Sequence, residues 1–275
     1  MAASKDRDRL SERLRVDPGS SVDLGTFDPS ETFGWKREDA EAEQQQYEDK
    51  LTDLQERMWA EGKHSLLIVL QGIDAAGKDG TIRHVMDAFN PQGCDVVGFK
   101  APTPQEERHD FLWRVHPHAP GKGSVAIFNR SHYEDVIIVR VHGLVPTKVW
   151  RGRYRSINDW ERMLSDEGTT ILKFFLAIDK DEQRRRFQER VDDPTKRWKF
   201  HLADIEERKF WDAYRTAFEE MLAETSTDYA PWHLIPANHN WLRNLAVSEI
   251  VADAIDELNP QYPAAATGIE GLKVV

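Results

Sequence analysis

The sequence predicts an α/β fold of three layers, in which a mostly parallel sheet is covered by helices on both faces. Two observations support this prediction. Short apolar runs alternate with segments of helical periodicity along most of the 275 residues, as in domains built from strand–helix–strand units. The first of the strand-like runs leads directly into a glycine-rich loop and then into a helical segment. Ligands of such sheets bind at the carboxyl ends of the strands.

The elements follow from the spacing of apolar residues. The first is a helix over residues 37–61, where Leu51, Leu54 and Met58 recur at helical spacing. Five later runs predict buried strands, at 66–71, 94–99, 124–129, 171–179 and 232–237. The segments that follow the first strand predict helices at 80–89, 104–114, 131–141, 151–166, 181–191, 202–223 and 240–258.

The ends of the chain differ from its middle. Residues 1–34 are polar and contain turn residues, which predicts an extended arm lying on or off a single domain of residues 35–258. Residues 259–275 predict an irregular tail. Charges stand where a signal peptide would be apolar, and no apolar run reaches the roughly 20 residues that span a bilayer. We therefore expect a cytoplasmic protein with no membrane partner.

Composition limits the possible partners. The formal net charge of −11 argues against nucleic-acid binding, so a polyanionic ligand would need a local basic site. The single cysteine, Cys94, excludes an intrachain disulfide and a cysteine-rich zinc site. Its apolar neighbours predict a buried thiol and not a nucleophile.

A phosphate-binding loop is predicted between the first strand and the helix after it. Gly72-Ile-Asp-Ala-Ala-Gly77-Lys78 has the Gly-x4-Gly-Lys spacing of a P-loop, in which backbone N–H groups and a helix N-terminus face phosphate oxygens. The candidate phosphate-binding residues are Gly72, Ala75, Ala76, Gly77, Lys78, Asp79, Gly80 and Thr81.

Two acids in this loop predict a metal. Asp79 stands where a P-loop usually has Ser or Thr, and Asp74 lies within the loop. Two carboxylates would repel phosphates unless they held Mg²⁺, which bridges carboxylate and phosphate oxygens. A helix N-cap without metal contact is the alternative for Asp79.

A second polar site follows the strand at 124–129. The residue at its end is Asn129, where P-loop kinases commonly carry a metal-binding acid. Glu134 or Asp135, one helical turn further on, can replace that acid, and Arg130 can stabilise charge on a transferring phosphoryl group. The alternative is a solvated helix N-terminus that favours acidic residues.

A basic segment lies within the acidic chain. Residues 183–201 contain seven Lys or Arg and three acids. Their position after the fourth strand predicts a helical lid, about residues 181–209, that closes over phosphates. A solvated charged face is the alternative.

Four blocks of sequence, taken in order, resemble the polyphosphate kinase 2 family. They are GIDAAGKDGTIRHV, FKAPTPQEERHDFLWRVH, IFNRSHYEDVIIVRVH and the lid segment that begins DKDEQRRRF. The resemblance covers roughly residues 35–258. It implies a P-loop kinase core like that of thymidylate kinase, Mg²⁺-dependent phosphoryl transfer between inorganic polyphosphate and nucleotides, and a homodimer or homotetramer.

The resemblance also implies roles for single residues. The central catalytic set is Asp74, Lys78 and Arg130, and the polyphosphate and lid contacts are Lys100, Arg184, Arg186 and Lys199. Asp74, Asp79 and Glu134 are the candidate metal ligands. FNRSHYED, where many relatives read FDRSWYNR, resembles the branch that phosphorylates both AMP and ADP.

Two other functions stay open from the sequence. A nucleoside or nucleotide kinase with ATP as donor would use the same loop, although the basic lid favours a long polyanion. A non-catalytic sensor of polyphosphate or nucleotide would also use it, but would gain nothing from the acids without a metal. Adenine nucleotides are the expected substrates, with guanine nucleotides as the alternative.

Overall fold

A computed structural model describes residues 9–269 and 271–273 of the chain. Its sheet has six strands in the order β1-β6-β5-β2-β4-β3. The strands are β1 (Arg15–Val16), β2 (Ser65–Gln71), β3 (Cys94–Gly98), β4 (Val125–Asn129), β5 (Thr169–Ala177) and β6 (Trp232–Pro236). All neighbours are parallel except β1, which pairs with β6 in the antiparallel sense. The predicted mostly parallel α/β sheet is confirmed.

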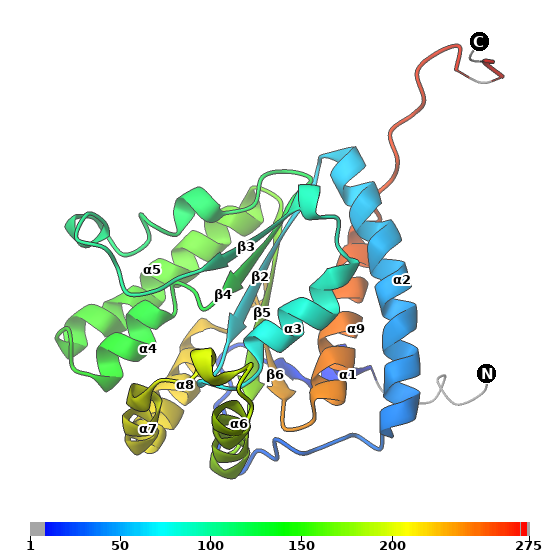
Figure 1. Ribbon diagram of the computed structural model, residues 1–275. Coiled ribbons are helices and arrows are strands. Elements are labelled where there is room, and N and C mark those ends of the chain that lie inside the picture. The colour runs from blue at the N-terminus through cyan, green and yellow to red at the C-terminus, as the bar shows by residue number, and fades with distance from the viewer. Residues whose placement is uncertain (1–8, 270, 274–275) are drawn as a thin grey trace.

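Helices cover both faces of this sheet (Figure 1). The helices of the described residues are α1 (Leu10–Arg13), α2 (Arg37–Glu61), α3 (Lys78–Val85), α4 (Glu134–Val141), α5 (Thr147–Asp166), α6 (Lys180–Asp192), α7 (Leu202–Glu207), α8 (Trp211–Thr225) and α9 (Asn240–Leu258), of which α6 and α7 lie beyond the carboxyl ends of the strands. None of these helices, in the part of the chain that the structure describes, combines the length and apolar character needed to cross a bilayer.

Strand β2 divides the interior into two cores. Side chains of a strand alternate between its faces, so Leu66, Ile68 and Leu70 pack with α2, α3 and α9. Leu67 and Val69 point the other way and pack with α4, α5 and α8. Every residue of β2 is buried, which explains its unbroken apolar sequence. The loop after β2 is thus carried by the most enclosed strand.

Two predicted helices have a different form. The segment 104–114 contains only a 3₁₀ turn, Glu106–Arg108. Local side chains satisfy its backbone instead: the Asp110 carboxylate accepts a hydrogen bond from the N–H of Leu112 (3.0 Å), as in an Asx turn. The predicted helix at 202–223 is two helices, α7 and α8, joined by a 3₁₀ turn at Arg208–Phe210.

The N-terminal segment packs onto the domain. Leu10, Leu14 and Val16 are buried, and the N–H of Leu234 in β6 donates to the carbonyl of Leu14 (2.8 Å). Further along, the N–H of Asn238 donates to the carbonyl of Pro29 (3.1 Å). Residues 17–34 therefore run past the carboxyl end of β6. A strand as short as β1 has no alternation for sequence reasoning to detect. Residues 1–8 of the predicted arm lie outside the described residues.

Cys94 begins the edge strand β3 and is half-buried, not fully buried as the sequence predicts. Burial, with a smaller contribution from the neighbouring carboxylate of Asp95, raises the pKa of its thiol to about 11. Little thiolate exists at neutral pH, so Cys94 is a weak nucleophile.

Candidate active site

The glycine-rich loop connects β2 to α3 and has the backbone of an anion-binding cradle. Ala75 (φ 66°) and Gly77 (φ 110°) adopt left-handed conformations, which turn successive N–H groups toward the inside of the loop. Gly72 (φ 149°) has no space for a side chain, because a Cβ there would lie 2.7 Å from the carbonyl oxygen of Leu176. The predicted P-loop therefore has both its shape and its position at the carboxyl end of a central strand.

Lys78 is the first residue of α3 and folds back over the loop. Its ammonium group donates to the carbonyl oxygens of Gly72 (2.7 Å) and Ile73 (3.4 Å). The side chain is buried, and burial, followed by repulsion from Arg130, lowers the pKa of Lys78 to about 8. Burial makes this charge costly even with Asp74, Glu134 and Asp79 nearby, and an anion bound in the loop would stabilise the ammonium form.

Arg130 and Asp74 form an ion pair between the ends of the neighbouring strands β4 and β2. The N–H of Arg130 continues the pairing of these strands by donating to the carbonyl of Leu70 (3.2 Å). The backbone of Arg130 then turns into the left-handed region (φ 63°), an uncommon conformation for a residue other than glycine. This turn directs the guanidinium toward the P-loop acid.

A buried network supports the turn at Arg130 from below. Tyr133 donates to the Glu161 carboxylate (2.7 Å), and Lys173 of β5 donates to the same carboxylate (2.6 Å) and to the Tyr133 hydroxyl (2.9 Å). His132 lies 3.2 Å from Glu161, and burial lowers the pKa of its imidazole. Connected buried partners of this kind fix side-chain positions, so the network gives Arg130 a rigid base.

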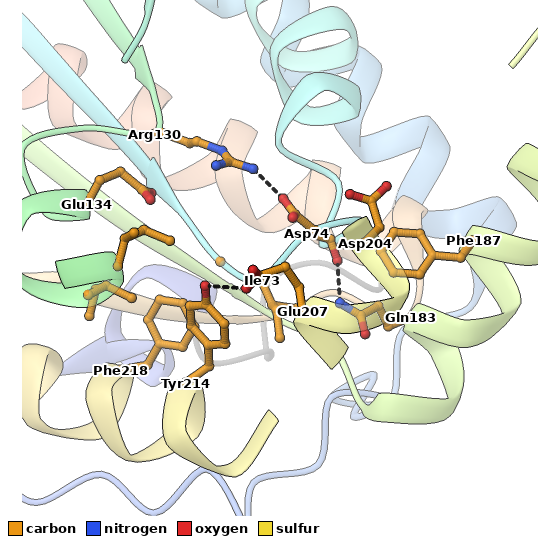
Figure 2. A pocket seen from close by; sticks show the side chains of 13 residues that line it. Ile73, Asp74, Arg130, Glu134, Gln183, Phe187, Asp204, Glu207, Tyr214 and Phe218 are labelled. Atoms are coloured by element: carbon orange, nitrogen blue, oxygen red, sulfur yellow. Dashed lines mark hydrogen bonds and ion pairs between the residues drawn. The ribbon is translucent and has the colours of Figure 1, made fainter. Parts of the chain in front are cut away.

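A pocket opens beside Asp74 and Arg130 (Figure 2). Glu134 lies on its α4 side, and burial raises the pKa of this carboxyl. Helix α6, which begins the segment predicted to be a lid, lies opposite, where Gln183 donates to the carbonyl oxygen of Asp74 (3.0 Å). The remaining lining comes from the loop, α4, the lid and α8, and includes Gly72, Ile73, Ile137, Ile138, Phe187, Asp204, Glu207, Tyr214 and Phe218.

The three candidate metal ligands do not face one space. Asp74 and Glu134 line the pocket, whereas Asp79 accepts hydrogen bonds from the Asn129 amide (2.8 Å) and from Lys199 of the lid (3.4 Å). Within residues 9–269 and 271–273, no group of three or more Asp, Glu, His or Cys side chains is arranged to bind a metal ion without other ligands. Mg²⁺ usually takes one or two carboxylates and fills its shell with phosphate oxygens and water, so Asp74 and Glu134 fit it.

The other residues predicted as polyphosphate and lid contacts lie in three different places. Arg186 is buried, donates to the carbonyl oxygens of Ala75 and Ala76 (2.9 Å each), and so holds the P-loop from the lid side. Arg184 is exposed on α6 beside Asp181 (3.2 Å). Lys100 is exposed in the loop after β3. Neither of these last two lines the pocket around Asp74.

Asp135 is not the strand-end acid that the sequence allows. It is buried on the far side of α4, where the guanidinium groups of Arg114 (3.2 Å) and Arg153 (3.7 Å) contact it. Successive residues of a strand point to opposite faces, but the direction of side chains in the helical turn that follows a strand depends on packing. The sequence therefore does not distinguish Glu134 from Asp135.

Sequence reasoning missed two groups of the site. Gln183 contacts the backbone of Asp74, and Arg243 of α9 lies beneath the P-loop. Gln183 stands at the start of the basic segment and has no distinctive spacing. A single arginine within the apolar helix NWLRNLAVSEIVADAI was the one available signal for Arg243.

Comparison with known proteins agrees with this geometry. The family model described as "Polyphosphate kinase 2 (PPK2)" matches residues 34–263. The chain is 53% identical to an AMP/ADP-polyphosphate phosphotransferase of Meiothermus ruber, over 96% of this chain and 99% of that protein. It is 43% identical to an ADP-polyphosphate phosphotransferase of Rhodopseudomonas palustris, over 92% of each.

A solved structure supports the same assignment. The crystal structure of polyphosphate kinase 2 from Arthrobacter aurescens TC1 superposes with a TM-score of 0.93 at 41% identity, covering 98% of this chain and 97% of that one. The similarity extends over the P-loop, the Arg130 turn and the lid together. The resemblance seen in the four sequence blocks is confirmed, and the chain belongs to the polyphosphate kinase 2 family.

Proposed function

We propose that the protein transfers phosphoryl groups between inorganic polyphosphate and adenine nucleotides, converting AMP to ADP and ADP to ATP, and the reverse. The observation that carries this proposal is the arrangement of Lys78, Asp74 and Arg130 at the P-loop under a basic lid. Relatives named for AMP/ADP and ADP transfer support the substrate class. Guanine nucleotides are the alternative acceptors.

The reaction requires positioning and charge, and no catalytic base. An oxygen of the nucleotide phosphate, already ionised, attacks the terminal phosphorus of polyphosphate, and the bond to the bridging oxygen breaks, leaving a polyphosphate that is one unit shorter. Arg130 lies where it can stabilise charge on the transferring group, and Lys78 can bind the donor phosphates. Gln183 lines the pocket from the lid side, and closure of the lid over bound substrate would exclude water as a competing acceptor.

Asp74 and Glu134 are the residues that would hold Mg²⁺. A bound Mg²⁺ would neutralise phosphate charge and orient the oxygens for transfer. The raised pKa of Glu134 reflects a buried carboxyl beside Asp74, and a cation between the two would favour the ionised form. Activity should be lost when EDTA removes divalent cations and restored by excess Mg²⁺.

The direct test uses purified protein, Mg²⁺ and long-chain polyphosphate with either AMP or ADP, and nucleotides are separated by chromatography. ATP from ADP supports polyphosphate-dependent transfer, and ADP followed by ATP from AMP supports the dual acceptor. Transfer from ATP to a nucleoside monophosphate, with no product from polyphosphate, would instead identify an ATP-donor kinase. Tight Mg²⁺-independent polyphosphate binding without turnover would identify a sensor.

Lys199 of the lid is expected to contribute to polyphosphate affinity. It lies above Asp79 at the N-terminus of α3, with 30% of its side chain exposed, and bound phosphate offers it a stronger partner. Lys199→Gln should raise the KM for polyphosphate about tenfold, as expected for a lost charged hydrogen bond. The effect on kcat should be smaller, as measured from initial rates at varied polyphosphate.

The matched control is Lys209→Gln, which alters a second lid lysine that pairs with Glu206 (2.5 Å) and is mostly exposed. Its KM should match that of the wild type. Equal effects of both substitutions would show that Lys199 acts only through the net charge of the lid.

We also propose, from the family, that the protein is a cytoplasmic homodimer or homotetramer. Light scattering coupled to size-exclusion chromatography distinguishes these two assemblies from a monomer.

A further inference from the structure

An arginine lies beneath the P-loop where the reaction described above gives it no role. Helix α9 follows β6 and packs against α3 (Figure 1). Arg243, in the first turn of α9, is 2% exposed, and its guanidinium lies against the backbone between Gly77 and Gly80. It is among the largest fully buried side chains of the described protein.

The guanidinium occupies the space that side chains of the loop would need. A Cβ on Gly77 would collide with it, and a Cβ on Gly80 would lie 3.1 Å from one of its nitrogens. The absence of side chains at both positions is therefore explained by Arg243 as well as by the backbone conformation of Gly77 (φ 110°). Arg243 and the two glycines together determine the path of the loop at the start of α3.

The partners of Arg243 are neutral. Its guanidinium donates to the side-chain oxygens of Asn240 (2.8 Å) and Asn244 (2.8 and 3.2 Å). Among the described residues, no carboxylate lies within ion-pair distance of it. These amide oxygens satisfy the hydrogen bonds of the guanidinium but leave its charge uncompensated.

The neighbouring side chain of Arg186 provides no negative charge for Arg243 either. Arg186 pairs with Glu182, which also pairs with Arg185. Burial, together with repulsion from Arg186, lowers the pKa of Arg243 to about 9. Buried charges are normally paired, because a charge without a counter-ion is costly in a medium of low dielectric constant.

We propose that Arg243 is a positioning residue whose guanidinium shapes the Gly77–Gly80 turn from behind and whose uncompensated charge is neutralised by phosphate bound in the loop. This inference rests on the proposed function, because it requires that the P-loop binds phosphate. The α3 N-terminus and Lys78 attract the anion from the binding side, and Arg243 adds to that field from the protein side. Bound phosphate thus supplies the negative charge that Arg243 lacks among its described neighbours.

The test compares a charged with a neutral replacement. Arg243→Lys keeps the charge and loses the planar fork, whereas Arg243→Gln keeps hydrogen-bonding capacity and loses the charge. We expect the melting temperature without anion to change little in Arg243→Gln. Addition of inorganic tripolyphosphate should raise the melting temperature clearly in the wild type and Arg243→Lys, and much less in Arg243→Gln.

Kinetics provide a second readout. Arg243→Gln should raise the KM for polyphosphate about tenfold with a smaller change in kcat, and Arg243→Lys should stay within about threefold of the wild type. The control is Arg140→Met, which removes a partly buried arginine paired with Glu220 (2.8 Å). It should lower the melting temperature and leave the tripolyphosphate effect unchanged.

Several outcomes would overturn the inference. Equal tripolyphosphate effects in Arg243→Gln and Arg243→Lys would show that the charge is irrelevant. If Arg243→Gln does not fold, Arg243→Met replaces it, and failure of both would show that Arg243 serves folding alone. A wild type that tripolyphosphate does not stabilise would remove the proposed function together with this inference, whereas the first two results remove the inference alone.

Discussion

Asp74→Asn is expected to lower kcat by at least about 10³-fold while the protein stays folded. The substitution keeps the shape of the side chain and removes its charge. Arg130 then loses the ion pair that holds its guanidinium over the P-loop, and the pocket loses one of the two carboxylates that fit Mg²⁺. Both losses act on the reacting phosphoryl group, so kcat should fall more than the affinity for either substrate.

The measurement is the initial rate of ATP formation from ADP at saturating polyphosphate, with circular dichroism and the melting temperature as tests of folding. Asp53→Asn is the matched control, because Asp53 forms a surface ion pair with Arg57 on α2, away from the pocket. It should leave kcat unchanged. A folded Asp74→Asn protein with more than a tenth of wild-type kcat would contradict a central role for Asp74.

The position of the site could be predicted because it depends on strand ends. The apolar run at 66–71 and the run at 124–129 become adjacent parallel strands, so the residues that follow them meet at one edge of the sheet. Asp74 and Arg130 are 56 residues apart and still form an ion pair. No tertiary information was needed beyond the rule that ligands bind at the carboxyl ends of parallel strands.

The partners of the individual acidic side chains could not be predicted, because they depend on the direction that each side chain takes when the elements pack. Glu134 and Asp135 are adjacent in sequence, and one faces the pocket while the other pairs with Arg114. Asp79 stands at the N-terminus of α3, where the sequence allows either a metal ligand or a cap; the structure gives it Asn129 and Lys199 as partners.

The helical prediction for 104–114 shows a second kind of error. Residues 105–108 (QEER) are good helix formers, but Thr103 and Glu106 hydrogen-bond each other's backbone and close a single turn. Side chains that bond to nearby backbone groups compete with a continuing helix. Propensity and spacing do not weigh that competition.

Lys78→Ala is expected to lower kcat/KM for polyphosphate by at least about 10³-fold. Lys78 is the one P-loop side chain that carries positive charge into the cradle, and its removal leaves Asp74 and Asp79 near the bound phosphates with less compensation. Lys78→Arg is the comparison that keeps the charge. A folded Lys78→Ala protein with near wild-type kcat/KM would place the donor phosphates outside the loop.

The charge of Lys78 also predicts a pH dependence. Because kcat/KM reports the free enzyme, and the pKa of Lys78 falls from the usual 10.5 to about 8, kcat/KM for polyphosphate should decline above about pH 8. Bound phosphate favours the ammonium, so kcat at saturation should persist to higher pH. The free energy of unfolding changes in the opposite sense. Between pH 8 and 10.5 the unfolded chain binds more protons at Lys78 than the folded protein does, so the contribution of Lys78 to the free energy of unfolding rises with pH. Lys78→Arg should remove the decline of kcat/KM near pH 8, and a decline that persists in this variant would assign it to another group.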